Sequence, residues 1–569
     1  MLMSSERLVT IRSVYRQLLL VILINVPTVS FGLALGWVSL ASGEAAEAGG
    51  EEGEGAGAVV AAVTTFAASS LGVPISARAL RYGRKFAVIA TSFTFVICWS
   101  LKLVGGPWCM VAARTAAGLG AAGAWALAPL LAREMCSAAW GGAAAAAVVP
   151  AHNLGVLLMY LAADARLPHA TVLWWCLGLS VSHCFVFMLM PESPAFLAAS
   201  GKLERSLRWL RGSPGADGAG SSAVSGAGAT SLKSELAALP SPDLVDRSAF
   251  ALAKDMLSDK RRRRAFFIGG MAVVGQEACG VLALLQYAER VFVLAERGVE
   301  VEAAVGAGDV GGAALMSPAR HAVILGVVQL AASFIALYFV ERVGRRPLIV
   351  WSALCTGLCL AAGAALVARP RLRVGGVRAA GLALAAAVAA DSAGLQPAPY
   401  ALLADMFHYE FRSCAVLLVT AAAGAGNALE VCVFPLVARS GGLQAAVALA
   451  AAVTLAYAAF AFAALPETRR RTPQQIYDAL ERDTLVCTLI ALLKRFTKRT
   501  AKNSSCPEKG TPETKITSKN PTIIKRNISF SLSTTKQSRD SNAVNIESAI
   551  NSDVTLHTIT NKETENTNL

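Results

Sequence analysis

The chain alternates between long apolar runs and short polar or charged segments. The apolar run 322–340 is followed by the charged segment 341–347, Glu-Arg-Val-Gly-Arg-Arg-Pro, and a second apolar run starts at Leu348. Two apolar runs that flank a basic turn predict a hairpin of two membrane-spanning helices. The segment 81–85, Arg-Tyr-Gly-Arg-Lys, stands between two other apolar runs much earlier in the chain. One such turn in each half of the chain indicates a duplicated helical bundle.

The apolar runs predict an all-α membrane protein with twelve transmembrane helices in two six-helix halves. A helix needs about 20 apolar residues to cross the hydrocarbon core of a bilayer. We expect the spans at residues 17–40, 57–77, 86–104, 108–132, 143–163, 170–190, 265–289, 321–340, 348–367, 379–403, 414–438 and 443–464.

The spans divide the chain into four parts. Residues 1–190 form the N-terminal six-helix half, and residues 265–464 form the C-terminal half. Between them, residues 191–264 are polar and contain a Gly/Ser/Ala-rich stretch, which predicts a flexible cytoplasmic linker flanked by short helices. Residues 465–569 form a cytoplasmic tail that we expect to be mostly disordered, because its last part is rich in Ser, Thr, Asn and Lys.

The basic residues predict the orientation of the bundle. Most of them fall on one side of the predicted spans, which the positive-inside rule assigns to the cytoplasm together with both termini. Arg369, Arg371, Arg373 and Arg378 fall on the opposite side. Either the duplicated topology overrides them, which we expect, or a helix is miscounted there. The net charge of +14 is then a topology signal, so the lipid bilayer is the expected partner and nucleic acid is not.

Composition supports this class and gives no sign of an enzyme. Hydrophobic residues make up 55% of the chain and charged residues only 16%, values that do not suit the surface of a soluble domain. Most of the twelve cysteines lie inside apolar runs, and the six histidines are scattered. Neither set has the spacing of metal ligands. We therefore expect no cofactor, no metal and no catalytic residue.

Four segments together resemble the sugar porter family of the major facilitator superfamily. Residues 191–212, which begin Pro-Glu-Ser-Pro, are similar to the segment after the family's sixth helix, and residues 466–476, which begin Pro-Glu-Thr, are similar to its partner after the twelfth. Segments 81–85 and 341–347 are similar to two of its inter-helix loops. Within the family, residues 30–40 are most similar to insect facilitated trehalose transporters. The resemblance implies a major facilitator fold and a multi-pass carrier in the plasma membrane.

The resemblance also implies a charged gate. In the family, acids and arginines at matching positions form cytoplasmic salt bridges and helix caps that close the inner face. A network of such pairs can bias a two-state equilibrium, although each exposed pair contributes little. The alternative is that these residues only anchor helix ends. The positions are Arg84, Arg114, Glu134, Glu192, Glu341, Arg342, Gly344, Arg345, Arg346, Asp405, Arg412 and Glu467.

A sugar-binding site follows from the same resemblance. It implies substrate-binding roles for Gln276, Glu277, Gln329, Tyr400 and Asn427. Gln329 and Asn427 match positions in the eighth and eleventh helices at which the family has polar amide side chains. The alternative for each amide is a hydrogen bond between helices, and for Tyr400 it is ordinary packing.

Several family positions are changed in this chain. Glu277 stands where the family has a second glutamine, Leu282 where it has an asparagine, Val149 where it has a glutamine and Gly424 where it has a tryptophan.

Glu277 is the most unusual of these changes. An acid at mid-membrane depth is costly, and it is a functional candidate by default. Protonated, it would imitate the missing glutamine or couple transport to protons; ionised, it would favour a cationic substrate or an ion pair; a third alternative gives it no role in transport. Asp391 and Glu430 are further intramembrane acids. Residues 18–40 contain no carboxylate, whereas proton-coupled members of the family carry their proton acceptor in this helix.

Three functions follow from the sequence. The first is facilitative, uniport transport of a sugar, trehalose or a hexose, by alternating access. The second is a carrier of a different solute that uses Glu277. The third is a non-transporting sugar sensor, which the lost polar contacts and the long tail would suit.

Overall fold

The apolar runs of the first half form seven helices, six of which are long. The computed structural model describes residues 5–47, 54–136, 141–190, 192–193, 196, 249–286, 318–368, 374–469 and 471–482. All of these lie in one compact unit. Most of the predicted linker and the tail beyond residue 482 lie outside the described residues. The helices of the first half are α1 (Ser5–Glu47), α2 (Glu54–Tyr82), α3 (Arg84–Val104), α4 (Pro107–Met135), α5 (Gly141–Ala146), α6 (Val148–Asp164) and α7 (His169–Met188).

The second half has the same kind of elements with more breaks. It begins with α11 (Ala249–Ser258), a helix inside the predicted linker, and it ends with the amphipathic α20 (Pro473–Arg482). Between these lie α12 (Lys260–Glu277), α13 (Val281–Gln286), α15 (Pro318–Arg342), α16 (Arg345–Val367), α17 (Val374–Ala390), the π-helical turn η2 (Asp391–Leu395), α18 (Ala398–Met406) and α19 (Tyr409–Ala464).

Helices cover each of the twelve predicted spans. Ten helical segments in the described part of the chain are long and apolar enough to cross a membrane. The last of these, Glu410–Ala464, has a non-helical residue at Gly442 (φ 78°), which separates the two spans predicted there. The predicted span at 57–77 lies in α2, whose first part has no described side chains. The described residues therefore confirm the predicted all-α class.

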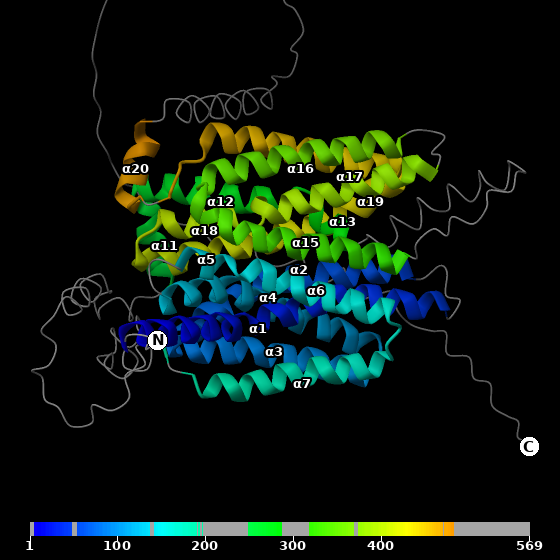
Figure 1. Ribbon diagram of the computed structural model, residues 1–569, viewed down its shortest axis with the longest axis horizontal. Helices are drawn as coiled ribbons and strands as arrows, with labels where there is room; N and C mark the ends of the chain where they lie inside the picture. The colour runs from blue at the N-terminus through cyan, green and yellow to red at the C-terminus, as the bar shows by residue number, and fades with distance from the viewer. Residues whose placement is uncertain are drawn as a thin grey trace, which may run out of the picture. The chain divides into compact units, whose positions relative to one another are not determined.

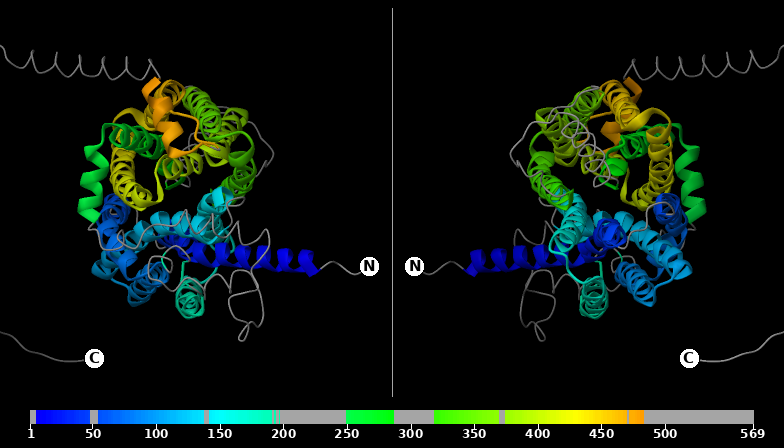
Figure 2. Two further views of the ribbon diagram at one scale, coloured as in Figure 1. Left: turned by 90° about the vertical axis from the view of Figure 1, so that its left-hand side faces the viewer. Right: turned by 90° about the vertical axis from the view of Figure 1, so that its right-hand side faces the viewer.

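The two halves lie side by side, and two pairs of helices make most of the contact between them. In Figure 1 the first half is coloured blue to cyan and the second green to orange, and Figure 2 shows the two groups of helices end-on. The α2 helix packs against α19, and α6 packs against α15. Large apolar side chains such as Trp174, Trp175 and Phe185 are more than half exposed, as expected for residues that face lipid.

Small residues allow close packing inside the first half. Gly32 of α1 faces Gly155 of α6, and a Cβ atom at either position would lie 3.0 Å from the Cα atom of the other. Membrane helices commonly associate through such small residues, since the hydrophobic effect does not drive contacts between helices in lipid. This contact brings α1 and α6 close together.

Candidate functional site

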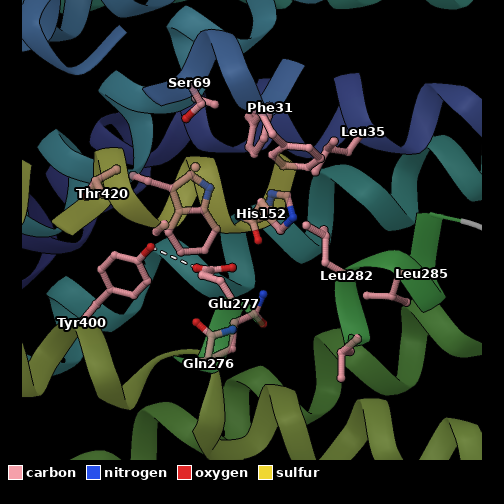
Figure 3. A pocket seen from close by; sticks show the side chains of 18 of the residues that line it. Phe31, Leu35, Ser69, His152, Gln276, Glu277, Leu282, Leu285, Tyr400 and Thr420 are labelled. Carbon is pink, nitrogen blue, oxygen red and sulfur yellow. Dashed lines mark hydrogen bonds between the residues drawn. The ribbon is translucent and has the colours of Figure 1, made fainter. Parts of the chain in front are cut away.

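A cavity of about 770 Å³, measured with the solvent space at its mouth, lies between the two halves. The first half lines it with side chains of α1, α2, α4 and α6, and the second with side chains of α12, α13, α15, η2, α18 and α19. Figure 3 shows aromatic and polar side chains from both halves pointing into it.

All five predicted substrate-binding residues lie on the wall of this cavity: Gln276, Glu277, Gln329, Tyr400 and Asn427. The Tyr400 hydroxyl donates a hydrogen bond of 3.1 Å to Oε1 of Glu277 (Figure 3), and Asn427 also hydrogen-bonds this carboxyl group. Gln276 and Gln329 are buried, and their Oε1 atoms receive no hydrogen bond from the described residues. Those two oxygens therefore do not tie helices together here, while their role toward a substrate stays a prediction.

Breaks in the helices bring these side chains to the cavity. The α12 helix ends at Glu277, and Gly280 adopts a φ of 82° before α13 begins, a conformation that favours glycine. A π-helical turn begins at Asp391, and Pro397 precedes α18. Such irregular turns are frequent at functional sites. Both breaks place an acid, Glu277 or Asp391, at the cavity wall.

The structure adds cavity residues that the sequence analysis did not select: Trp125 of α4 and His152 of α6. The Trp125 ring lies 5.5 Å from the Tyr400 ring and 5.6 Å from the His152 ring, centroid to centroid. Asp391, whose orientation the sequence left open, also lines the cavity. The one signal for these residues in the sequence is a polar or large aromatic side chain inside an apolar run.

The positions at which this chain departs from the family that it resembles fall in two places. Leu282 and Gly424 lie on the cavity wall, so the loss of an amide and of an indole changes the site itself. Val149 is not among the residues of that wall; it packs in an apolar cluster with Leu20 and Phe187. The valine therefore fits the core of the first half.

Charged residues gather where α2 ends and α3 begins, together with the equivalent turns of the second half; we call this the charged end of the bundle. Arg84 pairs with Glu134 at 3.3 Å within the first half. Within the second half, Arg345 pairs with Glu341 at 3.1 Å and with Asp405 at 3.2 Å. The family resemblance implied salt bridges among acids and arginines of this set, but it did not give the pairs that form.

An ion pair joins the two halves at the charged end. Nη1 of Arg133, at the end of α4, lies 2.6 Å from Oδ1 of Asp405 in α18. Asp405 is 8% exposed and also accepts a hydrogen bond from Thr468. Arg133 was not among the residues predicted from the sequence, although it directly precedes Glu134. Its role depends on the packing of α18, a helix of the other half, against the end of α4.

Two glutamates cap equivalent turns in the two halves. Glu192 accepts the backbone N–H of Lys85 at 2.9 Å, next to Gly83, whose φ is 132°. Glu467 accepts the backbone N–H groups of Arg345 and Arg346 at 3.2 Å each, next to Gly344, whose φ is 108°. A carboxylate at the first N–H groups of a helix satisfies donors that have no partner inside the helix. The paired arrangement agrees with a duplicated bundle.

The remaining arginines of the predicted gate bind the backbone or an aromatic ring. Arg412 donates to the carbonyl oxygens of Ala404 and Phe407, and Arg346 donates to that of Phe462. The Arg342 guanidinium lies over the Tyr338 ring. These contacts favour the alternative in which such residues anchor helix ends.

Arg114 is not part of the charged end, so the prediction that placed it there is wrong. It lies early in α4, about 30 Å along the helix from Glu134 at 1.5 Å per residue. Its guanidinium lies over the Trp37 ring, 5.2 Å from the centroid, and Lys102 lies over the same ring. Helix α4 runs from one end of the bundle to the other, so Arg114 and Glu134 lie near opposite ends.

Comparison with known proteins agrees with this geometry. The family model described as "Sugar (and other) transporter" matches residues 53–480. The probable metabolite transport protein CsbC of Bacillus subtilis is 23% identical over 71% of this chain and 81% of its own length. The facilitated trehalose transporter Tret1 of Bombyx mori is 24% identical over 59% of this chain and 62% of its own length. The match to the high-affinity hexose transporter HXT6 of Saccharomyces cerevisiae spans about half of that protein, 48%.

Solved structures show the same fold. The proton:xylose symporter XylE bound to 6-bromo-6-deoxy-D-glucose aligns with a TM-score of 0.61 at 20% identity, over 81% of this chain and 98% of that one. The inward-open form of the Escherichia coli xylose transporter XylE aligns with a TM-score of 0.58 at 18% identity, over 82% and 99%. From its segments, its fold and its match to the family model, this chain belongs to the sugar porter family of the major facilitator superfamily.

Proposed function

We propose that the protein is a facilitative carrier, a uniporter, of a sugar, trehalose or a hexose, in the plasma membrane. The observation that carries the proposal is the convergence of Gln276, Gln329, Asn427 and Tyr400 from four helices on one cavity between the halves. A sugar that leaves water must exchange its hydrogen bonds for partners in the protein. Amide and hydroxyl groups around an aromatic wall supply such partners.

The two halves would alternate around this site. Arg133 and Asp405 hold the halves together at the charged end, so the solute would enter from the opposite end and leave after this pair separates. Rocking of one repeat against the other around a fixed site is the usual motion of carriers built from repeats. We place the charged end, with both termini, on the cytoplasmic side, since basic residues favour that side.

Uniport rather than proton symport is supported by the first helix. Its described side chains, residues 15–37, include no carboxylate. A proton-coupled carrier needs a group that binds and releases a proton during the cycle. The family resemblance locates that group in the first helix, so we propose downhill transport for this chain.

The proposal is tested by influx of labelled trehalose and of labelled glucose into cells that express the full chain. Empty-vector cells at the same pH are the control, and surface labelling measures how much protein reaches the plasma membrane. Saturable influx of either sugar above the control is the expected result. Absence of influx of both sugars, with the protein at the surface, would reject the sugar carrier and leave a carrier of another solute or a sensor.

A further inference from the structure

Two acidic side chains face the central cavity from the second half, and the wall offers them no lysine or arginine. Glu277 ends α12 and Asp391 begins η2, and both line the cavity. They lie close enough to interact electrostatically. Among the described residues of the wall, His152 is the one titratable base, and it packs against Phe31 and Trp125 on the side of the first half.

A third acid nearby has a structural explanation. Glu430 of α19 accepts the backbone N–H of Ala283 at 2.8 Å, in the first turn of α13, and it is not among the residues that line the cavity. A carboxylate at the start of a helix stabilises donors that would otherwise lack a partner. Glu277 and Asp391 are therefore the two acids that line the cavity itself.

The cavity wall is rich in hydrogen-bond acceptors that lack donors. Asp391 is 4% exposed, and its Oδ1 receives no hydrogen bond from the described residues. The Oε1 atoms of Gln276, Gln329 and Gln396 lack donors as well. An amide can turn over and present its NH₂ group instead, whereas an ionised carboxylate can only accept. When ionised, the Asp391 carboxylate therefore needs a donor, and the described wall directs none to its Oδ1 atom.

Aromatic rings form part of the wall near these acids. Trp125 and Tyr400 lie 5.5 Å apart, and Phe31 and Phe66 line the cavity from α1 and α2. Figure 3 shows Phe31 and His152 on the side of the cavity that faces Glu277. The faces of aromatic rings attract cations, and Trp is the strongest of them in this respect. Carboxylates together with aromatic faces are a suitable environment for an organic cation.

An ammonium group matches what the wall lacks. It carries one positive charge and three donors and it has no acceptor, so it satisfies a carboxylate oxygen and compensates a charge that is costly inside a membrane. We propose that the solute of this carrier bears an ammonium group beside its hydroxyl groups, as a protonated amino sugar does. Asp391 and Glu277 hold the ammonium group, and the cavity amides hold the hydroxyl groups. This inference rests on the proposed carrier function and names the substrate class of the same site.

The test compares solutes that differ at one position of the same ring. The purified full-length protein is reconstituted in liposomes, and uptake of labelled glucosamine and of labelled glucose is measured at a pH at which the amine is protonated. Unlabelled glucosamine, glucose and N-acetylglucosamine serve as competitors, because the acetylated sugar keeps the ring and the nitrogen but loses the charge. We expect glucosamine to compete at a concentration at least tenfold lower than either neutral sugar.

Variants assign the effect to the two acids. We expect Asp391→Asn and Glu277→Gln each to lower the ratio of glucosamine uptake to glucose uptake at least tenfold. Glu410→Gln is the control, because Glu410 is an exposed acid at the start of α19 and does not line the cavity; its ratio should match that of the unmodified protein. The ratio is independent of how much protein is reconstituted.

Three other outcomes would each reject part of the proposal. Saturable glucose uptake in which glucosamine has no advantage over N-acetylglucosamine would overturn the ammonium site and leave the sugar carrier in place. An advantage for glucosamine that survives both Asp391→Asn and Glu277→Gln would overturn the assignment to these two acids. No uptake of glucosamine, glucose or trehalose by the folded protein would overturn the carrier function together with the inference.

Discussion

Arg133 of the first half and Asp405 of the second half form an ion pair of 2.6 Å at the charged end of the bundle. Asp405 also lies 3.2 Å from Arg345, which pairs with Glu341. One buried carboxylate thus connects the end of α4 to the turn between α15 and α16. Any opening of the charged end has to break the ion pair between Arg133 and Asp405.

Asp405→Asn should shift the protein toward a state that is open at the charged end. Arg133 loses the charged partner that the described residues give it, and Arg345 keeps only Glu341. We expect a change of about 1–2 kcal/mol, between the values for exposed and for buried pairs. Spin labels at the exposed residues Tyr82 and Val343, which lie at this end in different halves, report the change by double electron–electron resonance. Longer distances should gain population.

The control for this variant is Asp478→Asn. Asp478 pairs with Arg261 at 3.4 Å, and both side chains are about half exposed within the second half. Its substitution should leave the distance distribution unchanged. Identical distributions for Asp405→Asn and for the unmodified protein would show that the pair does not hold the halves together.

Gly344→Ala should destabilise the protein. Gly344 has a φ of 108° and a ψ of 163°, and a Cβ atom there would lie 2.7 Å from a carboxylate oxygen of Glu467. Such a backbone conformation costs a residue with a side chain about 1–3 kcal/mol. Thermal unfolding in detergent should show a lower midpoint than for the unmodified protein.

Gly178→Ala provides the matched comparison, because Gly178 is helical and a Cβ atom there would have no neighbour within 4 Å. Alanine is preferred over glycine inside a helix by about 0.5–1 kcal/mol, so this variant should be as stable as the parent or more so. Equal midpoints for the two alanine variants would mean that the turn at Gly344 is not strained by a side chain.

Tyr400→Phe should weaken substrate affinity while the protein stays folded. The variant keeps the ring beside Trp125 and removes the hydroxyl that donates to Glu277. Loss of a hydrogen bond to a carboxyl group predicts a rise in KM of roughly five- to tenfold. Concentration-dependent influx of the labelled sugar that proves to be transported measures it.

Tyr457→Phe separates this effect from a general loss of packing. The Tyr457 hydroxyl donates to the carbonyl oxygen of Ala272 at 2.7 Å, and the residue does not line the cavity. This variant should lose about 1 kcal/mol of stability and keep its KM. Comparable increases in KM for both variants would argue against a direct role of Tyr400 in the site.

The helices could be predicted from the sequence because each apolar run is long enough to cross a bilayer. The run 321–340 became α15, and the two runs on either side of Gly442 became the two parts of α19. The turns at 81–85 and 341–347 could be placed because a glycine between basic residues marks the break between helices. The predicted orientation of the bundle in the membrane stays a prediction.

The partners across the cavity could not be predicted, since they depend on how helices distant in the sequence pack. Gln276 and Tyr400 were found through the family resemblance, and the structure brings them to one cavity. Trp125 and His152 lie in apolar runs, where helical periodicity does not separate a core residue from a cavity residue. The position of Asp391 depends on a π-helical turn, for which the sequence carries no recognised signal.

For Arg114 the sequence led to a wrong prediction. The resemblance implied a role in the cytoplasmic gate for both Arg114 and Glu134, which flank the predicted fourth helix, but the length of α4 puts them near opposite ends of the bundle. A sequence pattern gives the helix to which a charge belongs, and the rise per residue then decides the depth at which it lies.

The most direct test of a carrier that alternates around this cavity is counterflow. Liposomes containing the purified protein are loaded with unlabelled sugar, trehalose or glucose, and diluted into a trace of the same labelled sugar. An alternating carrier should transiently accumulate label above its external concentration, and Asp405→Asn should change the rate of this exchange. Label that only equilibrates, at the rate of protein-free liposomes, would contradict the account.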